Sequence, residues 1–230
     1  MRYLFLVALL LSCGSPTKSN LDIYYGKPTY EQFFTSIGDG SYYWCGGTLI
    51  ERQWVLTAKH CVNNWEDLKV KIGSQMKNDW NGGWKHEVLS VKQIIRHSSW
   101  DLALLKLSEE SDMIPIRSYG SLDVPDQTML HTYGFGRTED GSYPNELLTV
   151  GVRYQKDNGK NFIKPEREFS AGHEKFDSCG GDSGGPIIHR PRQKLLGVVS
   201  WGIGCGKADE GYPGVYSKID VEWIRRELEK

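Results

Sequence analysis

The sequence predicts an all-β protein, either a β-barrel or a β-sandwich, that ends in one helix. Short strand-like runs are separated by Gly, Asn, Asp and Ser turns along most of the chain. The glycine content, 26 Gly against 9 Pro, is typical of a chain with many turns. Apolar residues follow helical spacing in 221–230 alone.

We expect strands at 47–58, 68–72, 88–95, 102–107, 147–154, 185–188 and 195–201. A polar connection at 108–123 divides these strands into two sets. In the expected helix, Val221, Ile224 and Leu228 share one face, and Asp220 stands where an N-cap residue is preferred.

The composition is that of an ordinary globular chain. Its 230 residues include 28 basic and 29 acidic side chains, which give a formal net charge of −1. Hydrophobic residues make up 39% and charged residues 25%, so a collagen-like, disordered or multi-span membrane chain is not expected. No basic excess is available to neutralise a phosphate backbone, and nucleic acid is therefore not an expected partner.

The amino-terminal segment predicts export. The apolar run 3–11 is too short for a membrane-spanning helix, which needs roughly 20 residues, and it resembles the core of a signal peptide. The segment 10–14 resembles a bacterial lipobox, in which Cys13 would be lipidated and would provide the only membrane contact. Ordinary signal cleavage after Gly14 and a short buried strand are the alternatives. We expect 1–22 to precede the folded domain.

The cysteine count, five, is odd for an exported chain. Setting Cys13 aside leaves four residues, of which Cys45 and Cys61 form one local pair and Cys179 and Cys205 the other. Two disulfides in an oxidising compartment would explain them, although four cysteines permit three pairings. No Cys-x-x-Cys motif is present, so a zinc or redox site is not expected.

Three segments carry the chemistry, and they read LTAKHC at 56–61, DLALL at 101–105 and GDSGGP at 181–186. In this order, His then Asp then Ser, they resemble the trypsin-like serine proteases, and the resemblance extends over 23–230. Supporting motifs are CGGTLI at 45–50, YGFG at 133–136, SWG at 200–202 and PGVY at 213–216.

The resemblance implies a fold of two six-stranded antiparallel β-barrels, with the active site between them and a C-terminal α-helix. Barrel one would span about 23–110, barrel two about 120–219, and the helix about 220–230. It also implies a serine endopeptidase, in which Ser183 is the nucleophile, His60 its base and Asp101 the carboxylate that orients the imidazole. The backbone N–H groups of Gly181 and Ser183 would form the oxyanion hole.

The same resemblance implies a specificity for basic side chains. Asp177, in the segment DSC at 177–179, matches the floor of the trypsin specificity pocket and would bind Lys or Arg. Gly202 and Gly214 match the pocket walls, and the other substrate-binding positions would be Ser178, Ser200 and Trp201. The implied partners are polypeptides with Lys or Arg before the cut, and protein inhibitors.

The chain departs from the family pattern at several places. Lys59 stands where a small alanine usually precedes the catalytic histidine. Its ammonium group could act electrostatically on His60 or extend into solvent, and we expect the second. Ser170 replaces a cysteine of a disulfide common in animal relatives, which favours a bacterial member with fewer bridges. The segment 74–76 offers no acidic calcium ligand, so neither a metal nor another cofactor is expected.

Activation in this family needs a freed aliphatic amino terminus that pairs with the aspartate before the nucleophile. Asp182 is present, and Ile23 is the best candidate for the new terminus, although no basic residue precedes it. Lipidation at Cys13 would leave Ile23 without a free amine, so a permanently tethered zymogen and an idle binding protein stay as alternatives. An esterase would show the order Ser, Asp, His instead. The protein would be periplasmic, a lipoprotein of the outer membrane, or secreted.

Overall fold

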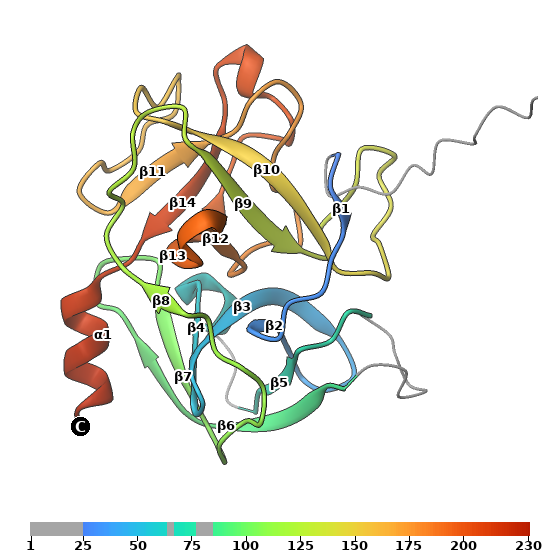
Figure 1. Ribbon diagram of the computed structural model, residues 1–230, viewed down its shortest axis with the longest axis vertical. Helices are drawn as coiled ribbons and strands as arrows, with labels where there is room; N and C mark the ends of the chain where they lie inside the picture. Colours follow the sequence, from blue (N-terminus) through green and yellow to red (C-terminus); the bar gives the residue numbers. More distant parts are fainter. Residues whose placement is uncertain (1–24, 64–66, 77–84) are drawn as a thin grey trace, which may run out of the picture.

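A computed structural model describes residues 25–63, 67–76 and 85–230. The expected signal segment, Cys13 and Ile23 lie outside these described residues. The chain forms two antiparallel β-barrels that lie side by side, with one helix at the carboxyl end (Figure 1). The fold class implied by the sequence motifs is confirmed. No helix in the described ranges is both long and apolar enough to cross a bilayer.

The first barrel closes in the order β2-β3-β4-β7-β6-β5. Its strands are β2 (Phe34–Gly38), β3 (Tyr43–Glu51), β4 (Trp54–Thr57), β5 (Lys69–Ile72), β6 (Glu87–Arg96) and β7 (Ala103–Leu107). The single strand expected at 47–58 is wrong. That stretch is a hairpin, in which β3 and β4 pair around a turn at Arg52 and Gln53, because two polar residues in succession interrupt the buried pattern.

The second barrel closes in the order β9-β12-β13-β14-β11-β10, since β10 also pairs with β9. Its strands are β9 (Met129–Gly134), β10 (Leu148–Gln155), β11 (Glu168–Ala171), β12 (Pro186–His189), β13 (Lys194–Trp201) and β14 (Gly214–Lys218). Two short strands, β1 (Lys27–Pro28) and β8 (Ser118–Tyr119), extend this sheet. The pairing of β1 with β10 differs from the expected division, which assigned this segment to barrel one.

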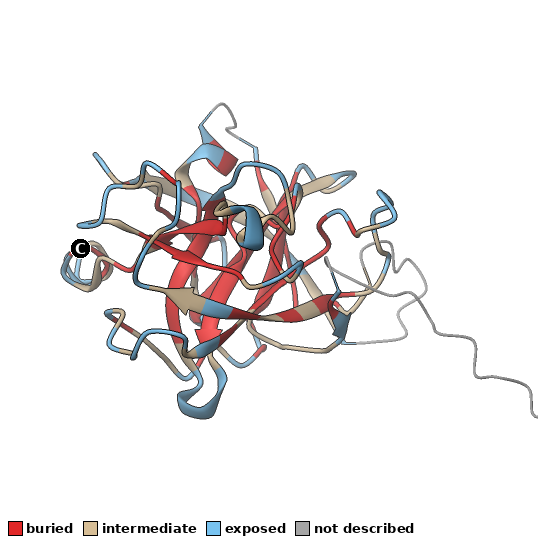
Figure 2. Ribbon diagram, turned by 90° about the horizontal axis from the view of Figure 1, so that it is seen from above, coloured by how far each residue is buried: buried red, intermediate tan, exposed pale blue. Residues whose placement is uncertain are grey.

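The apolar residues that are buried form two cores. Buried residues, drawn in red in Figure 2, follow the strands. One core fills barrel one and continues across the barrel interface to the helix α1 (Val221–Leu228). The other fills barrel two. The helix is close to the expected one: Asp220 caps it by accepting a hydrogen bond from the N–H of Trp223, and Trp223 and Ile224 are buried.

Candidate active site

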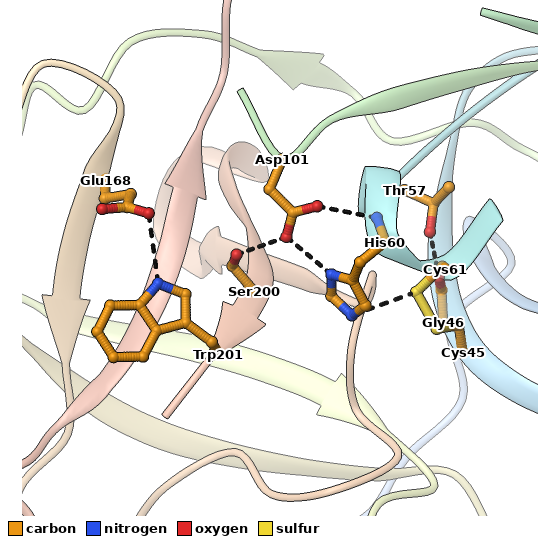
Figure 3. Close-up of polar contacts among 9 residues, drawn as sticks. All are labelled: Cys45, Gly46, Thr57, His60, Cys61, Asp101, Glu168, Ser200 and Trp201. Carbon is orange, nitrogen blue, oxygen red and sulfur yellow. Dashed lines mark hydrogen bonds and ion pairs between the residues drawn. A yellow bond between two sulfur atoms is a disulfide. The ribbon is translucent and has the colours of Figure 1, made fainter. Parts of the chain in front are cut away.

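His60 and Asp101 are brought together by two connections of barrel one (Figure 3). His60 lies in the 3₁₀ helix η1 (Lys59–Val62), which follows β4, and Asp101 lies in the link between β6 and β7. Nδ1 of His60 is 2.8 Å from Oδ2 of Asp101, and the His60 backbone N–H donates to Oδ1 at 3.0 Å. A carboxylate only accepts, so Nδ1 is the donor in this contact, and in the neutral imidazole Nε2 then keeps its lone pair.

Barrel two reaches the same carboxylate. Ser200, at the end of β13, donates its hydroxyl to Oδ2 of Asp101 at 2.6 Å (Figure 3). Burial raises the pKa of Asp101, but the hydrogen bond and charge of His60 and the Ser200 hydroxyl outweigh it, and the pKa lies below its usual value. Asp101 therefore stays ionised where it faces His60. Sequence reasoning placed Ser200 among the substrate-binding residues and missed this bond.

Ser183 lies in the turn before β12, at the junction of the two barrels. Its carbonyl accepts from the N–H of Gly46 in β3 at 2.8 Å, and the next N–H, of Gly184, donates to Val199 at 2.9 Å. Among the residues that the structure describes, no hydrogen bond joins the Ser183 hydroxyl to His60. Nε2 of His60 instead lies 3.8 Å from Sγ of Cys61.

The backbone before Ser183 is shaped by a glycine and a buried acid. Gly181 has φ +100°, a conformation that favours glycine. Asp182 is fully buried and accepts N–H bonds from Gly136 at 2.7 Å and Cys179 at 2.8 Å. These bonds tie the turn to the segment after β9, so the N–H groups of Gly181 and Ser183 have a rigid support.

A pocket of about 340 Å³ opens beside Ser183. Ser178, Trp201, Gly202 and Gly214 line it, and these are four of the residues expected to bind substrate. Asp177 lies behind the lining and is 1% exposed. Its carboxylate accepts from the N–H of Ser178 at 2.8 Å and of Gly206 at 3.1 Å.

The acid behind the pocket is electrostatically unusual. Burial raises the pKa of Asp177 to about 8, although the N–H donors of Gly206 and Ser178 act against it. Removing an ionised carboxylate from water is costly unless a cation pairs with it. At neutral pH the buried carboxyl group of Asp177 is therefore mostly protonated and uncharged.

The two glycine walls differ in the space around them. A Cβ at Gly214 would lie 2.5 Å from Oδ1 of Asp177, whereas a Cβ at Gly202 would meet nothing closer than 3.5 Å.

The predicted disulfide pairs are both formed, Cys45–Cys61 and Cys179–Cys205. The second crosses the pocket rim, because both of its cysteines are lining residues.

Two further contacts at the site were missed by sequence reasoning. Nε1 of Trp201 donates to Glu168 at 3.3 Å, which fixes the half-exposed indole beside the pocket (Figure 3). The expectation that Lys59 extends into solvent is wrong. Its Nζ donates to the carbonyl oxygens of His97 at 2.8 Å and Ser98 at 3.4 Å, because these groups lie within reach of a four-carbon side chain.

One group of possible metal ligands occurs in the described part of the chain. The ligand atoms of Cys45, His60 and Cys61 lie within 4.8 Å of one another. The two sulfur atoms are bonded to each other as a disulfide, so they are not thiolates and do not suit a metal ion.

Comparisons with known proteins agree with this geometry. The family model described as Trypsin matches residues 25–224. Trypsin 5G1 of Aedes aegypti is 36% identical over 212 residues, which cover 82% of this chain and 76% of that protein. Trypsin I-P1 of Gallus gallus is 34% identical over 81% of this chain and 80% of its own length. The solved structure of neuropsin, a serine protease from mouse brain, superimposes with a TM-score of 0.78 at 25% identity, covering 89% of this chain and 99% of neuropsin.

Proposed function

Because the chain belongs to the trypsin family and is a serine endopeptidase, we propose that it cuts polypeptides after Lys or Arg through a Ser183 acyl-enzyme. The observation that carries the specificity is the buried carboxylate of Asp177 behind a pocket that opens beside Ser183. A Lys or Arg side chain would supply a cation and charge-assisted hydrogen bonds to this carboxylate. Gly202 and Gly214 leave room for such a long side chain.

The proposed reaction begins with proton transfer. Ser183 Oγ attacks the carbonyl carbon of the scissile peptide while Nε2 of His60 takes the hydroxyl proton. Asp101 supports this step by holding the proton on Nδ1 and by stabilising the imidazolium that forms. The hydrogen bond from Ser183 to His60 forms as substrate binds, since catalytic hydrogen bonds commonly tighten only in the substrate complex.

The negative oxygen of the tetrahedral intermediate is bound by the N–H groups of Gly181 and Ser183. The carbon–nitrogen bond then breaks, and His60 returns the proton to the leaving amine. This leaves an ester on Ser183. A water molecule, deprotonated by His60, attacks the ester, and the acid product leaves as Ser183 regains its proton.

Peptides that differ only in the residue before the cut test this function. We expect cleavage after Arg and Lys, with little after Phe or Ala, and its loss in Ser183→Ala. Asp177→Ser should lose the basic preference while it retains reaction with a serine-directed phosphonylating reagent. Cleavage after Phe or Ala alone would contradict the specificity, and cleavage by Ser183→Ala would contradict the mechanism.

We further propose that 23–230 is the protease domain and that 1–22 is the export and tether segment. Two disulfides support folding in an oxidising compartment. Ile23, once freed, would pair with Asp182, whereas lipidation of Cys13 would keep the two apart until a cut occurs. Mass analysis and amino-terminal sequencing of active protein test this, and activity with an intact bond before Ile23 contradicts it.

A further inference from the structure

The segment that presents Asp101 is a short link, 97–102, between β6 and β7. The N–H of His97 closes it by donating to the carbonyl of Leu102 at 2.9 Å. Nδ1 of His97 accepts from the N–H groups of Ser99 at 3.1 Å and Trp100 at 2.9 Å. The backbone of the link therefore folds around the buried His97 side chain. Asp101 directly follows the residues that bond to His97.

Two outer anchors hold this link from other parts of the molecule. Since Nδ1 of His97 accepts, its Nε2 carries the proton and donates to Asp220, the N-cap of α1, at 3.2 Å. Arg167, just before β11, donates to the carbonyl of Ser99 at 2.8 Å. The link is thus fixed to the terminal helix and to barrel two.

The third anchor comes from Lys59, the residue bonded to His60 in the chain. Its half-buried side chain carries the ammonium group to the carbonyl oxygens of His97 and Ser98, at 2.8 and 3.4 Å. The neighbouring His60 meets Asp101 through both its N–H and its ring. Two consecutive residues therefore hold two parts of the same link. The small residue usual at this position has no donor that could make the first contact.

We propose that Lys59 is a positioning residue that sets the placement of Asp101 against His60. Hydrogen bonds from an ammonium group are stronger than those between neutral groups, so this contact resists displacement of the link relative to η1. The helix η1 is a single turn without a side-chain cap at its start, and the Lys59 contact adds to the hold of the Cys45–Cys61 disulfide on it. The inference rests on the proposed function, in which His60 and Asp101 act together.

Three variants test the role of Lys59 in turnover. Lys59→Met keeps the length of the side chain and removes its donors, Lys59→Arg keeps the donors, and Lys194→Met is the matched control. Lys194 also donates to a backbone carbonyl, that of Ser121 at 3.1 Å, but from the end of β13 away from the site. Concentrations are normalised by titrating the reactive serine.

We expect Lys59→Met to lower kcat by about tenfold on an Arg substrate with KM within a factor of about two, since small misplacements of catalytic groups are costly. Lys59→Arg should recover most of the rate, and Lys194→Met should match the wild type. If Lys59→Met does not fold, Lys59→Gln replaces it. Wild-type kcat in the folded variant overturns the inference, as does a lower unfolding temperature without any change in kcat.

A proton NMR spectrum supplies a readout that needs no turnover. We expect the proton between Nδ1 of His60 and Asp101, which are 2.8 Å apart, to resonate far downfield. This signal should move or broaden in Lys59→Met but not in Lys194→Met. An unchanged signal overturns the inference. An inactive wild-type protein would instead refute the proposed function, and the spectra would still decide whether Lys59 positions the pair.

Discussion

Ser200 and Asp101 join the two barrels through one hydrogen bond, 2.6 Å from the serine hydroxyl to Oδ2. That oxygen is also the acceptor for Nδ1 of His60 at 2.8 Å. The orientation of the imidazole therefore depends on barrel two, although His60 and Asp101 both belong to barrel one. The His60–Asp101 pair is therefore correctly oriented only when the two barrels are packed against each other.

Ser200→Ala should lower kcat by about tenfold, because a hydrogen bond to a charged group contributes roughly 1.5–3 kcal/mol. Steady-state kinetics on an Arg substrate measure the effect. Ser170→Ala is a matched control, since Ser170 is another buried serine of barrel two and its hydroxyl has no partner within the described chain. Equal rates for the two variants would contradict the role of Ser200.

Asp177 should make the binding of cations depend on pH. The pKa of this acid is raised to about 8, so at pH 7 the empty pocket holds mostly the protonated form. A guanidinium or amidinium ligand favours the carboxylate, and its affinity should rise between pH 6 and pH 9 with release of a proton. Calorimetry in buffers of different ionisation enthalpy measures this. Asp177→Asn should bind weakly and without such dependence, and equal proton release in both proteins would argue against the assignment.

Burial of Asp177 should also make the folded protein less stable as the pH rises. A carboxyl whose pKa is raised on folding holds its proton more tightly in the folded state, so stability is greatest below the unfolded value near 4 and falls as pH rises towards 8. Asp177→Asn removes this loss. We expect the variant to unfold at a higher temperature than the wild type at pH 8, by about 2–4 °C per kcal/mol gained. The difference should vanish in thermal scans at pH 4, and a variant less stable at pH 8 would contradict the burial argument.

Gly214→Ala should reduce activity and stability more than Gly202→Ala does. The new methyl group at 214 would lie 2.5 Å from Oδ1 of Asp177, far inside van der Waals contact, whereas at 202 its nearest neighbour would lie at 3.5 Å. Gly214→Ala should therefore lose most activity on Arg and Lys substrates and lower the unfolding temperature. Gly202→Ala should fold normally and raise KM. Kinetics and thermal unfolding of both variants check this. A larger loss of activity and stability in Gly202→Ala would mean that Gly214 is not the more crowded of the two positions.

Loss of the Cys179–Cys205 bridge should affect the pocket more than loss of Cys45–Cys61. The first bridge joins two lining residues of the pocket across a sequence separation of 26. Replacing both cysteines by serine should destabilise the fold by about 2–4 kcal/mol. It should also raise KM for Arg substrates, because the rim near Gly206, a donor to Asp177, loses its anchor. A double variant with unchanged KM would show that the rim is held by other contacts.

Local sequence patterns predicted most of what is local in the structure. The segments around His60, Asp101 and Ser183, the cysteine pairs and the capped helix were all readable, because each depends on residues close together in the chain. The strands β2, β9, β11 and β14 were not predicted. Their sequences are short and mixed, and they become strands by pairing with distant neighbours, as β11 does with β14.

The sequence by itself determined the family, the class of reaction and the residues expected to perform it. Tertiary structure alone decided how these residues are supported. It made Ser200 a partner of Asp101, raised the pKa of Asp177 by burial, and turned Lys59 towards the link that holds Asp101. The physical reason is that hydrogen bonds and desolvation act over a few ångströms in space. Closing two barrels against each other brings within that range residues that lie far apart along the chain.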